Sequence, residues 1–172
     1  MSRRMDTKKI TRLALLTAVA LALGWAERFI PMPMVGIKLG LANTVLLYAL
    51  YLLDIKSAVL LMGLKVLLSA LTYAGINAMF YSLGGGVVSL AMMVLVKTLG
   101  RDSVSLVGVS VVGGVFHNVG QLLIVAVIAS WRSALVLSPL LLVMGAVMGL
   151  VTGFVGKYAI NALKKIEGGG RG

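Results

Sequence analysis

The stretch VSLVGVSVVGGVFHNVGQLLIVAVIAS, residues 104–130, decides the fold class of this chain. It carries no charged residue, and as a helix it is long enough to cross the roughly 30 Å hydrocarbon core of a bilayer. A helix satisfies its backbone hydrogen bonds within one segment, as lipid surroundings require. The stretch therefore predicts a transmembrane helix, although its FHNVGQ segment brings together the chain's only histidine, an asparagine and a glutamine.

The rest of the chain repeats this apolar character. Of its 172 residues, 60% are hydrophobic and only 12% are charged, which is too few polar side chains for the surface of a soluble domain. Six runs are long enough to span a membrane: Ile10–Phe29, Ile37–Leu53, Lys56–Tyr73, Ala78–Leu99, Val104–Ser130 and Pro139–Leu163. We expect an all-α integral membrane protein with one six-helix transmembrane domain at 10–163, a basic N-terminus at 1–9 and a flexible tail at 164–172.

The basic residues predict the orientation. The chain has 16 Lys+Arg against 5 Asp+Glu, and in the six-span arrangement only Arg28, Lys38 and Arg132 fall on the side opposite the termini. Because basic residues concentrate on the cytoplasmic side, both termini are expected in the cytoplasm of a cell with the protein in its cell membrane. The positive charge then reflects topology and does not indicate a nucleic-acid partner.

The segment before the last span predicts a break. Ser138-Pro139 is a favourable helix start, because proline at the first helical position loses no hydrogen bond. We therefore expect residues 131–137 to form a separate short amphipathic segment at the membrane surface.

Small residues recur on the first and last spans. Ala14, Ala18 and Ala22 lie four residues apart and so share one helix face, which allows another helix to approach closely in lipid. Two interpretations stay open, namely packing within the bundle and an exposed surface for docking a second membrane protein. A glycine run in the last span favours internal packing: Gly145, Gly149, Gly153 and Gly156.

Polar side chains within the apolar spans mark a candidate binding site, because polar groups at membrane depth are costly. Five of them fall in the outer half of their spans: Asn43, Tyr81, His117, Asn118 and Gln121. Gly84, Gly85 and Gly86 lie at a similar depth. Consecutive glycines weaken a helix, so we expect unwound backbone there that lines a cavity.

Mostly basic residues surround this predicted cavity. The outer loops place Glu27, Arg28, Lys38, Asn77 and Arg132 around it, and Lys65 lies near the middle of its span. A basic rim above a polar pocket favours an anionic ligand such as a phosphate or carboxylate. The alternative is that Arg28 and Lys38 merely anchor the protein at the interface. A midplane ammonium must reach the surface or find a partner, so Lys65 is a candidate for either a structural or a ligand contact.

The sequence lacks most of the groups that would allow His117 to bind a metal or to take part in a proton relay. One histidine and no cysteine leave too few nitrogen or sulfur ligands for a zinc-type site, so we expect no bound metal and no cofactor. No acidic residue falls in the interior of a predicted span, which argues against a carboxylate proton relay. We interpret His117 as a hydrogen-bonding ligand contact, or alternatively as a structural link between spans.

Three stretches carry a resemblance to a known family: GIKLGLANTVLLYALYLL (36–53), MFYSLGGGVVSLAMM (79–93) and VGVSVVGGVFHNVGQLLIV (107–125). They resemble the Gx transporter family, also called heptaprenyl diphosphate synthase component I. More distantly, the chain is similar to the substrate-binding S components of energy-coupling factor (ECF) vitamin transporters. That similarity implies an outward-facing pocket, and it implies that Ala14, Ala18 and Ala22 meet a membrane-embedded coupling protein driven by two cytoplasmic ATPases.

The two family names imply different functions. Prenyl diphosphate synthases hold magnesium through paired aspartate-rich motifs, whereas Asp6, Asp54 and Asp102 are scattered, so we expect no enzyme activity. No phosphate-binding motif of the type G-x-x-x-x-G-K-[ST] is present either, so any ATP hydrolysis must come from partners. We expect a substrate-binding subunit of an importer. The alternative is a non-catalytic membrane subunit of isoprenoid or quinone metabolism, or of flavin or quinone electron transfer.

Overall fold

A computed structural model describes residues 7–30 and 41–169, with side chains described to residue 162 except at position 102. These residues form six helices joined by short helical turns and contain no strand. The helices are α1 (Thr7–Ala26), α2 (Leu41–Leu52), α3 (Ile55–Ser69), α4 (Ile76–Gly100), α5 (Leu106–Ile128) and α6 (Trp131–Gly169). The turns are η1 (Glu27–Phe29), η2 (Ala70–Ala74) and η3 (Arg101–Ser103).

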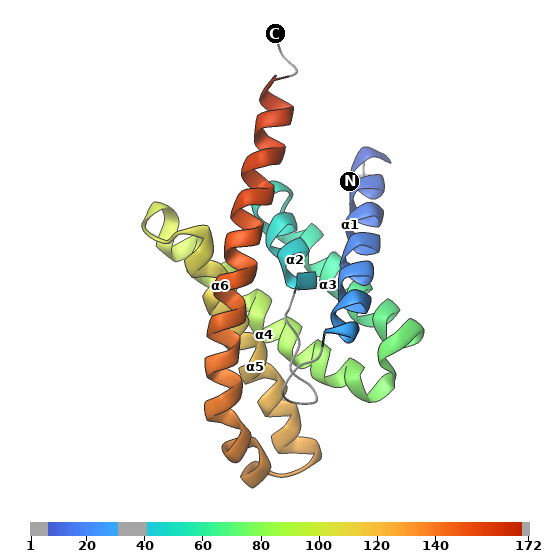
Figure 1. Cartoon of the computed structure of the whole chain (residues 1–172), viewed down its shortest axis with the longest axis vertical. Helices are drawn as coiled ribbons and strands as arrows, with labels where there is room; N and C mark the ends of the chain where they lie inside the picture. Colours follow the sequence, from blue (N-terminus) through green and yellow to red (C-terminus); the bar gives the residue numbers. More distant parts are fainter. Residues whose placement is uncertain (1–6, 31–40, 170–172) are drawn as a thin grey trace, which may run out of the picture.

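Five of the helices are long and apolar enough to cross a membrane, which confirms the predicted all-α integral membrane fold. The sixth, α2, has 12 residues, and at 1.5 Å per residue it extends only about 18 Å. Part of the predicted second span, residues 37–40, lies outside the described residues. The start of α1 and the end of α6 lie toward the same end of the bundle (Figure 1). Residues 164–169 of the predicted tail continue α6 as helix.

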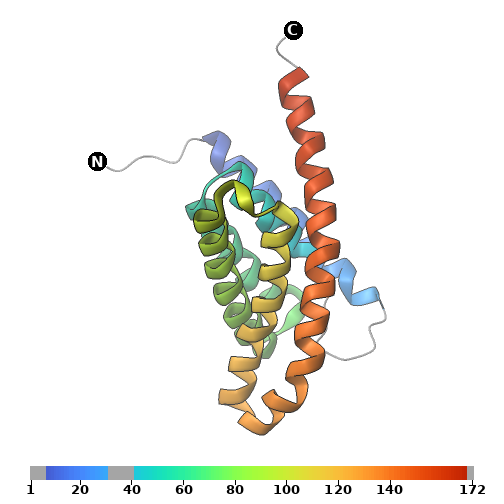
Figure 2. The ribbon, with the colours of Figure 1, turned by 90° about the vertical axis from the view of Figure 1, so that its left-hand side faces the viewer.

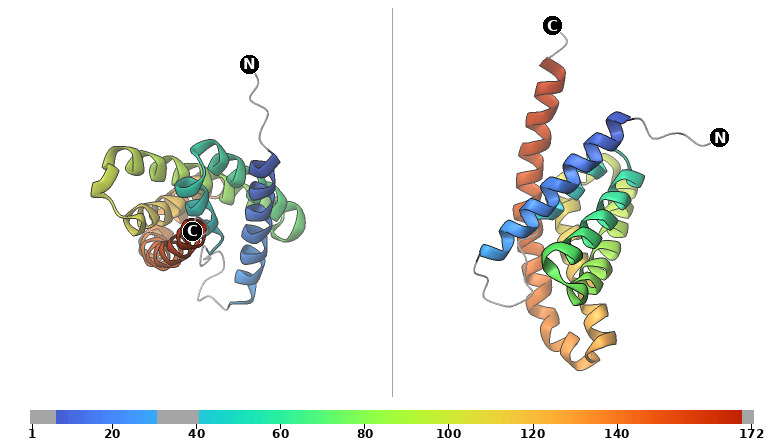
Figure 3. Two further views of the ribbon diagram at one scale, coloured as in Figure 1. Left: turned by 90° about the horizontal axis from the view of Figure 1, so that it is seen from above. Right: turned by 90° about the vertical axis from the view of Figure 1, so that its right-hand side faces the viewer.

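The first half of the bundle, α1 to α3, is packed mainly by large apolar side chains. Leu47, Leu50 and Leu61 are almost completely buried in one core cluster. Helix α1 contributes Leu13 and Ala20 to this cluster and lies across the outside of the bundle (Figure 3). The short helix α2 is buried beneath it, so α2 has little contact with the surroundings.

The second half, α4 to α6, is packed mainly through glycines. Helix α5 lies beside both α4 and α6 (Figure 2) and contacts them more extensively than any other pair of helices does. A Cβ atom added at Gly145 would lie 2.7 Å from the Gly114 carbonyl oxygen, and one added at Gly149 would lie 2.8 Å from the Ser110 carbonyl oxygen. The glycine run of α6 therefore packs inside the bundle, as its pattern favoured.

The predicted break before Pro139 is wrong. Helix α6 begins at Trp131 and continues through Pro139. Its true start is capped by Ser130, whose Oγ accepts from the Ser133 amide at 3.1 Å. Proline cannot donate to the carbonyl four residues earlier, but the Ser138 hydroxyl donates to that carbonyl, at Leu135, over 2.9 Å. A neighbouring side chain thus replaces the hydrogen bond that the proline removes.

Both ends of α2 are met by charged side chains from other elements. The Glu27 carboxylate accepts from the Ala42 amide at 3.1 Å, in the first turn of α2. The Lys97 ammonium donates to the Leu50 carbonyl at 2.5 Å, in the last turn, and lies 4.4 Å from the Tyr51 ring centre. Each charge complements the helix dipole and satisfies a terminal backbone group. This explains how so short a helix can end inside the bundle.

Candidate functional site

A polar cavity of about 80 Å³ lies where the two halves of the bundle meet. Its wall combines residues of α1, η1, α2, α3, η2, α4 and α5, so it exists only once these elements have assembled. The residues that line it are Gly24, Glu27, Ala42, Asn43, Leu46, Met62, Lys65, Val66, Ser69, Tyr73, Ser82, Gly86, Ser89, His117, Asn118 and Gln121. Six of the predicted site residues are therefore brought together here: Asn43, Lys65, Gly86, His117, Asn118 and Gln121.

Hydrogen bonds between helices, and one within α5, hold the polar side chains of this wall in place. The Lys65 ammonium of α3 donates to Asn43 Oδ1 of α2 at 2.8 Å. On α5, the side-chain nitrogen of Gln121 lies 3.3 Å from His117 Nε2, one helical turn away. Asn118 donates from Nδ2 to the Leu141 carbonyl of α6 at 2.5 Å. Lys65 thus has a partner at membrane depth, as an ammonium there requires.

The glycines of α4 act differently from the prediction. Helix α4 is continuous through Gly84, Gly85 and Gly86, so the expected unwinding is wrong. A Cβ added at Gly85 would lie 2.8 Å from the His117 ring, which shows that Gly85 gives the imidazole its space. A Cβ added at Gly84 would lie 3.1 Å from the Gly120 carbonyl oxygen. The glycines therefore allow α5 to approach α4 because they carry no side chain, and α4 stays helical through all three of them.

Glu27 is the site residue that sequence reasoning misplaced. The apolar spans suggested that no acid lies near His117, yet Glu27 lines the same cavity and is only 7% exposed. Its position at the end of the first span indicated a loop at the membrane surface. The signal that could have found it is the need of the buried α2 start for a hydrogen-bond acceptor, which Glu27 supplies at Ala42.

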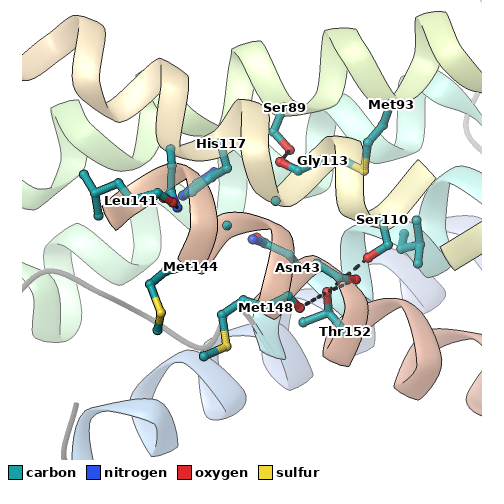
Figure 4. Close-up of a pocket in the computed structure, with 15 residues that line it drawn as sticks. Asn43, Ser89, Met93, Ser110, Gly113, His117, Leu141, Met144, Met148 and Thr152 are labelled. Carbon is teal, nitrogen blue, oxygen red and sulfur yellow. Dashed lines mark hydrogen bonds between the residues drawn. The ribbon is translucent and has the colours of Figure 1, made fainter. Parts of the chain in front are cut away.

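A second, smaller cavity of about 40 Å³ shares four wall residues with the first: Asn43, Ser89, His117 and Asn118. Figure 4 shows Ser110 and Thr152 toward one end of it and His117 toward the other. The Ser110 and Thr152 hydroxyls lie 3.0 Å apart, and the Ser89 hydroxyl donates to the Gly113 carbonyl at 2.8 Å. The shared residues form a polar partition between two chambers.

The remaining predicted site residues lie elsewhere. The Arg28 guanidinium donates to the Tyr73 carbonyl at 2.7 Å and stands 5.8 Å from the Tyr73 ring centre. It therefore fastens η1 to η2 beside the cavity without lining it. Asn77 is exposed, and Tyr81 is half-buried but is not among the residues of either cavity. Lys38 lies outside the described residues.

Tyr73, a wall residue of the cavity, reaches its position through the irregular segment η2, which follows α3. The last five residues before Gly75 form a π-helix, η2, which is a form often found at functional sites. This widened turn places Tyr73 beside Gly24 of α1, where an added Cβ would lie 2.5 Å from the Tyr73 hydroxyl. Gly75 then ends the segment with a φ of +83°, a backbone conformation that glycine adopts without strain. Gly24 and Tyr73 thereby form the cavity wall on the side of α1.

The fold and the cavity define a multi-pass membrane protein that encloses a small polar chamber between its helices. The chain belongs to the family described as heptaprenyl diphosphate synthase component I, whose family model matches residues 16–159. That match includes every residue that lines the cavity. Neither the search of curated proteins nor the search of solved structures gave a match.

Proposed function

We propose that this chain is the substrate-binding membrane subunit, or S component, of an ECF-type importer in the cell membrane, with both termini in the cytoplasm. It captures a small anionic metabolite or vitamin from outside. A membrane-embedded coupling protein and two cytoplasmic ATPases act as partners and provide the energy for transport. The chain itself binds its substrate without catalysing a reaction.

The observation that carries this proposal is the unpartnered small-residue face of α1. Ala14, Ala18 and Ala22 are all exposed on the outside of the bundle, whereas Leu13 and Thr17 of the same helix face inward. Alanine is not needed at a lipid-facing position, where larger apolar residues are equally stable. A smooth face of this kind instead lets a second helix pack closely. It supports a docking surface for the coupling protein.

The cavity supports the substrate-binding part of the proposal. Asn43, His117 and Gln121 offer hydrogen-bonding groups to a ligand, and Lys65 offers positive charge. Gly86 leaves room beside Met62 on the opposite wall. The cavity lies between helices and is bordered by Glu27 of η1 and Tyr73 of η2, so movement of these elements would open it for release of a ligand. Docking of α1 on a partner would supply such a movement, because η1 continues directly from α1.

The test is reconstitution with and without the partners. In liposomes the chain alone should bind substrate without accumulating it, and addition of an ECF coupling protein, its ATPases and ATP should produce uptake. The double variant Ala14→Leu/Ala18→Leu should reduce co-purification of the coupling protein by about tenfold or more, because the close helix contact is lost. The matched control is Leu15→Phe, which adds bulk at a neighbouring position that is 65% exposed. Substrate accumulation by the chain alone would contradict the proposal.

A second candidate function is favoured by the description of the family, which names a component of a synthase. In this alternative the chain is a non-catalytic membrane subunit of isoprenoid or quinone metabolism, or of flavin or quinone electron transfer. Mass spectrometry of gently purified protein separates the two candidates. A long-tailed prenyl species or a flavin bound at the cavity supports the alternative, whereas a small water-soluble metabolite supports import.

A further inference from the structure

The cavity has a negative pole that the predicted anionic ligand does not explain. Glu27 is only 7% exposed and lines the cavity. One of its carboxylate oxygens, Oε1, accepts from the Ala42 amide at 3.1 Å. A backbone amide at a helix start carries only a partial positive charge, and a carboxylate buried among apolar helices is costly unless its charge is balanced. A cationic group nearby, either Lys65 of the same cavity or a group of a ligand, therefore stabilises the Glu27 carboxylate.

The positive pole of the same cavity is Lys65. Lys65 donates to Asn43 Oδ1 at 2.8 Å, and Asn43 directly follows Ala42, the residue bound by Glu27. Consecutive residues of α2 thus anchor a carboxylate and an ammonium on one cavity wall. A ligand that carried only negative charge would be attracted by Lys65 and repelled by Glu27, and a purely cationic ligand would meet the reverse.

The size of the cavity limits the ligand. A volume of about 80 Å³ corresponds to about five to eight water-sized positions, at about 10 to 15 Å³ for each position. The second chamber adds about 40 Å³ behind Asn43, Ser89, His117 and Asn118. This space fits a small linear molecule and is far below the roughly 300 Å³ at which pockets for larger organic ligands begin.

We propose that the cavity binds a small zwitterion of amino-acid size, with its ammonium at Glu27 and its carboxylate or other anionic group at Lys65. This inference rests on the proposed substrate-binding function and changes the substrate class from anionic to net neutral. Charge-assisted hydrogen bonds at both ends are the strongest that such a site can make. They also fix the orientation of the ligand, since the two poles differ in sign.

The experiment compares three matched probes, which share one carbon chain, on the full chain in nanodiscs. γ-Aminobutyrate carries both charges, butyrate only the negative charge and butylamine only the positive charge. Glycine and β-alanine vary the distance between the charges. We expect at least one zwitterion to raise the thermal unfolding temperature, as a ligand that binds only the native state does. Butyrate and butylamine should raise it less at equal concentration.

Glu27→Gln distinguishes ligand recognition from simple capping of α2. The glutamine oxygen can still accept from Ala42, so the fold is kept, but the negative pole is lost. We expect the variant to bind the zwitterion about tenfold more weakly, because a charge-assisted hydrogen bond becomes a neutral one, and to gain affinity for butyrate. Lys65→Gln should shift the preference toward butylamine. Asp54→Asn, which removes a carboxylate outside the cavity, is the matched control and should leave the order of preference among the probes unchanged.

Two results would overturn the inference. One is equal stabilisation by butyrate and γ-aminobutyrate in the unaltered chain with no change of preference in Glu27→Gln. The other is no stabilisation by any zwitterion of the set. In either case the importer proposal still stands or falls on ATP-dependent uptake with the partner proteins, which does not depend on the charge of the substrate.

Discussion

The two halves of this bundle are packed in different ways. In α1 to α3, helices are separated by large side chains such as Leu47, Leu50 and Leu61. In α4 to α6, glycines bring backbone against backbone, as at Gly114 and Gly145. Side chains can change rotamer when helices shift, whereas two backbones in contact leave no atoms that can yield. The comparison indicates a rigid half and an adaptable half with the cavity between them.

The polar residues of the cavity wall belong to both halves. His117 and Asn118 belong to α5 of the rigid half, and the space around His117 depends on Gly85. Glu27 and Lys65 belong to the adaptable half, together with the exposed face of α1. We infer that α5 provides a fixed wall, while α1 and η1 provide the wall that opens.

The largest expected effect comes from adding one methyl group to the rigid half. Gly145→Ala places its Cβ 2.7 Å from the Gly114 carbonyl oxygen and 2.8 Å from Asn118 Nδ2. Because α5 cannot withdraw without breaking its contact with α4, we expect a loss of about 1 to 3 kcal/mol in the free energy of unfolding. Thermal unfolding of the purified protein in detergent measures the loss.

The matched control is Gly63→Ala in α3, where an added Cβ has no heavy atom within 4 Å. There the helix should gain about 0.5 to 1 kcal/mol, since alanine loses less backbone entropy than glycine. Opposite signs at the two glycines would show that the loss at Gly145 comes from its contact with α5. Similar losses at both positions would contradict this account of the α5–α6 contact.

A smaller effect on stability is expected at the two lysines that contact α2, and only one of the two should be needed for ligand binding. Lys97→Met removes the donor to the Leu50 carbonyl at the end of α2, and we expect a loss of about 1 to 2 kcal/mol in unfolding free energy. Binding of a cavity ligand should remain. Lys65→Met removes the donor to Asn43 inside the cavity and should instead abolish ligand binding. Titration of both variants with γ-aminobutyrate tests this, and loss of binding in Lys97→Met alone would contradict the assignment.

Much of the fold could be predicted from the sequence, because each apolar run determines its own helix in lipid. The break before Pro139 could not, since the compensating bond from the Ser138 hydroxyl to the Leu135 carbonyl depends on a side-chain rotamer. The unwinding expected at Gly84 to Gly86 failed for a related reason. Glycine weakens a helix in water, but in lipid the close approach of α5 makes the same residues favourable.

The candidate site was predicted in part. His117, Asn118 and Gln121 share one face of a single helix, so their neighbourhood follows from helical spacing alone. The contact between Asn43 and Lys65 depends on how α2 lies beside α3. The sequence indicated only the depth of each residue in the membrane. Glu27 was expected in an outer loop and not in the cavity wall, because its burial follows from its contact with the start of α2 at Ala42. Glu27 is the residue that most alters the expected ligand, and its burial therefore depends on long-range packing.

The smallest effect concerns the junction between α1 and the α2–α3 turn, at the adaptable half. Lys9 of α1 contacts Asp54 at 2.5 Å, and hydrogen bonds from Lys9 and from the Ser57 amide lower the Asp54 pKa from 3.8 to about 2. A lowered carboxyl pKa stabilises the fold above pH 3.8 and loses this contribution as the pH falls through about 2. Asp54 is 45% exposed, so solvent screening should limit the contribution to less than about 1 kcal/mol.

Asp54→Asn should therefore lower the unfolding temperature slightly at pH 5 and show a weaker fall than the unaltered chain between about pH 4 and pH 2. High salt should reduce the difference, because the pair is exposed. Since this ion pair fastens the start of α1, its loss should also loosen α1 without affecting α4 to α6, and amide hydrogen exchange can locate the change. Faster exchange in α5 or α6 would show that the two halves are coupled more tightly than their packing indicates.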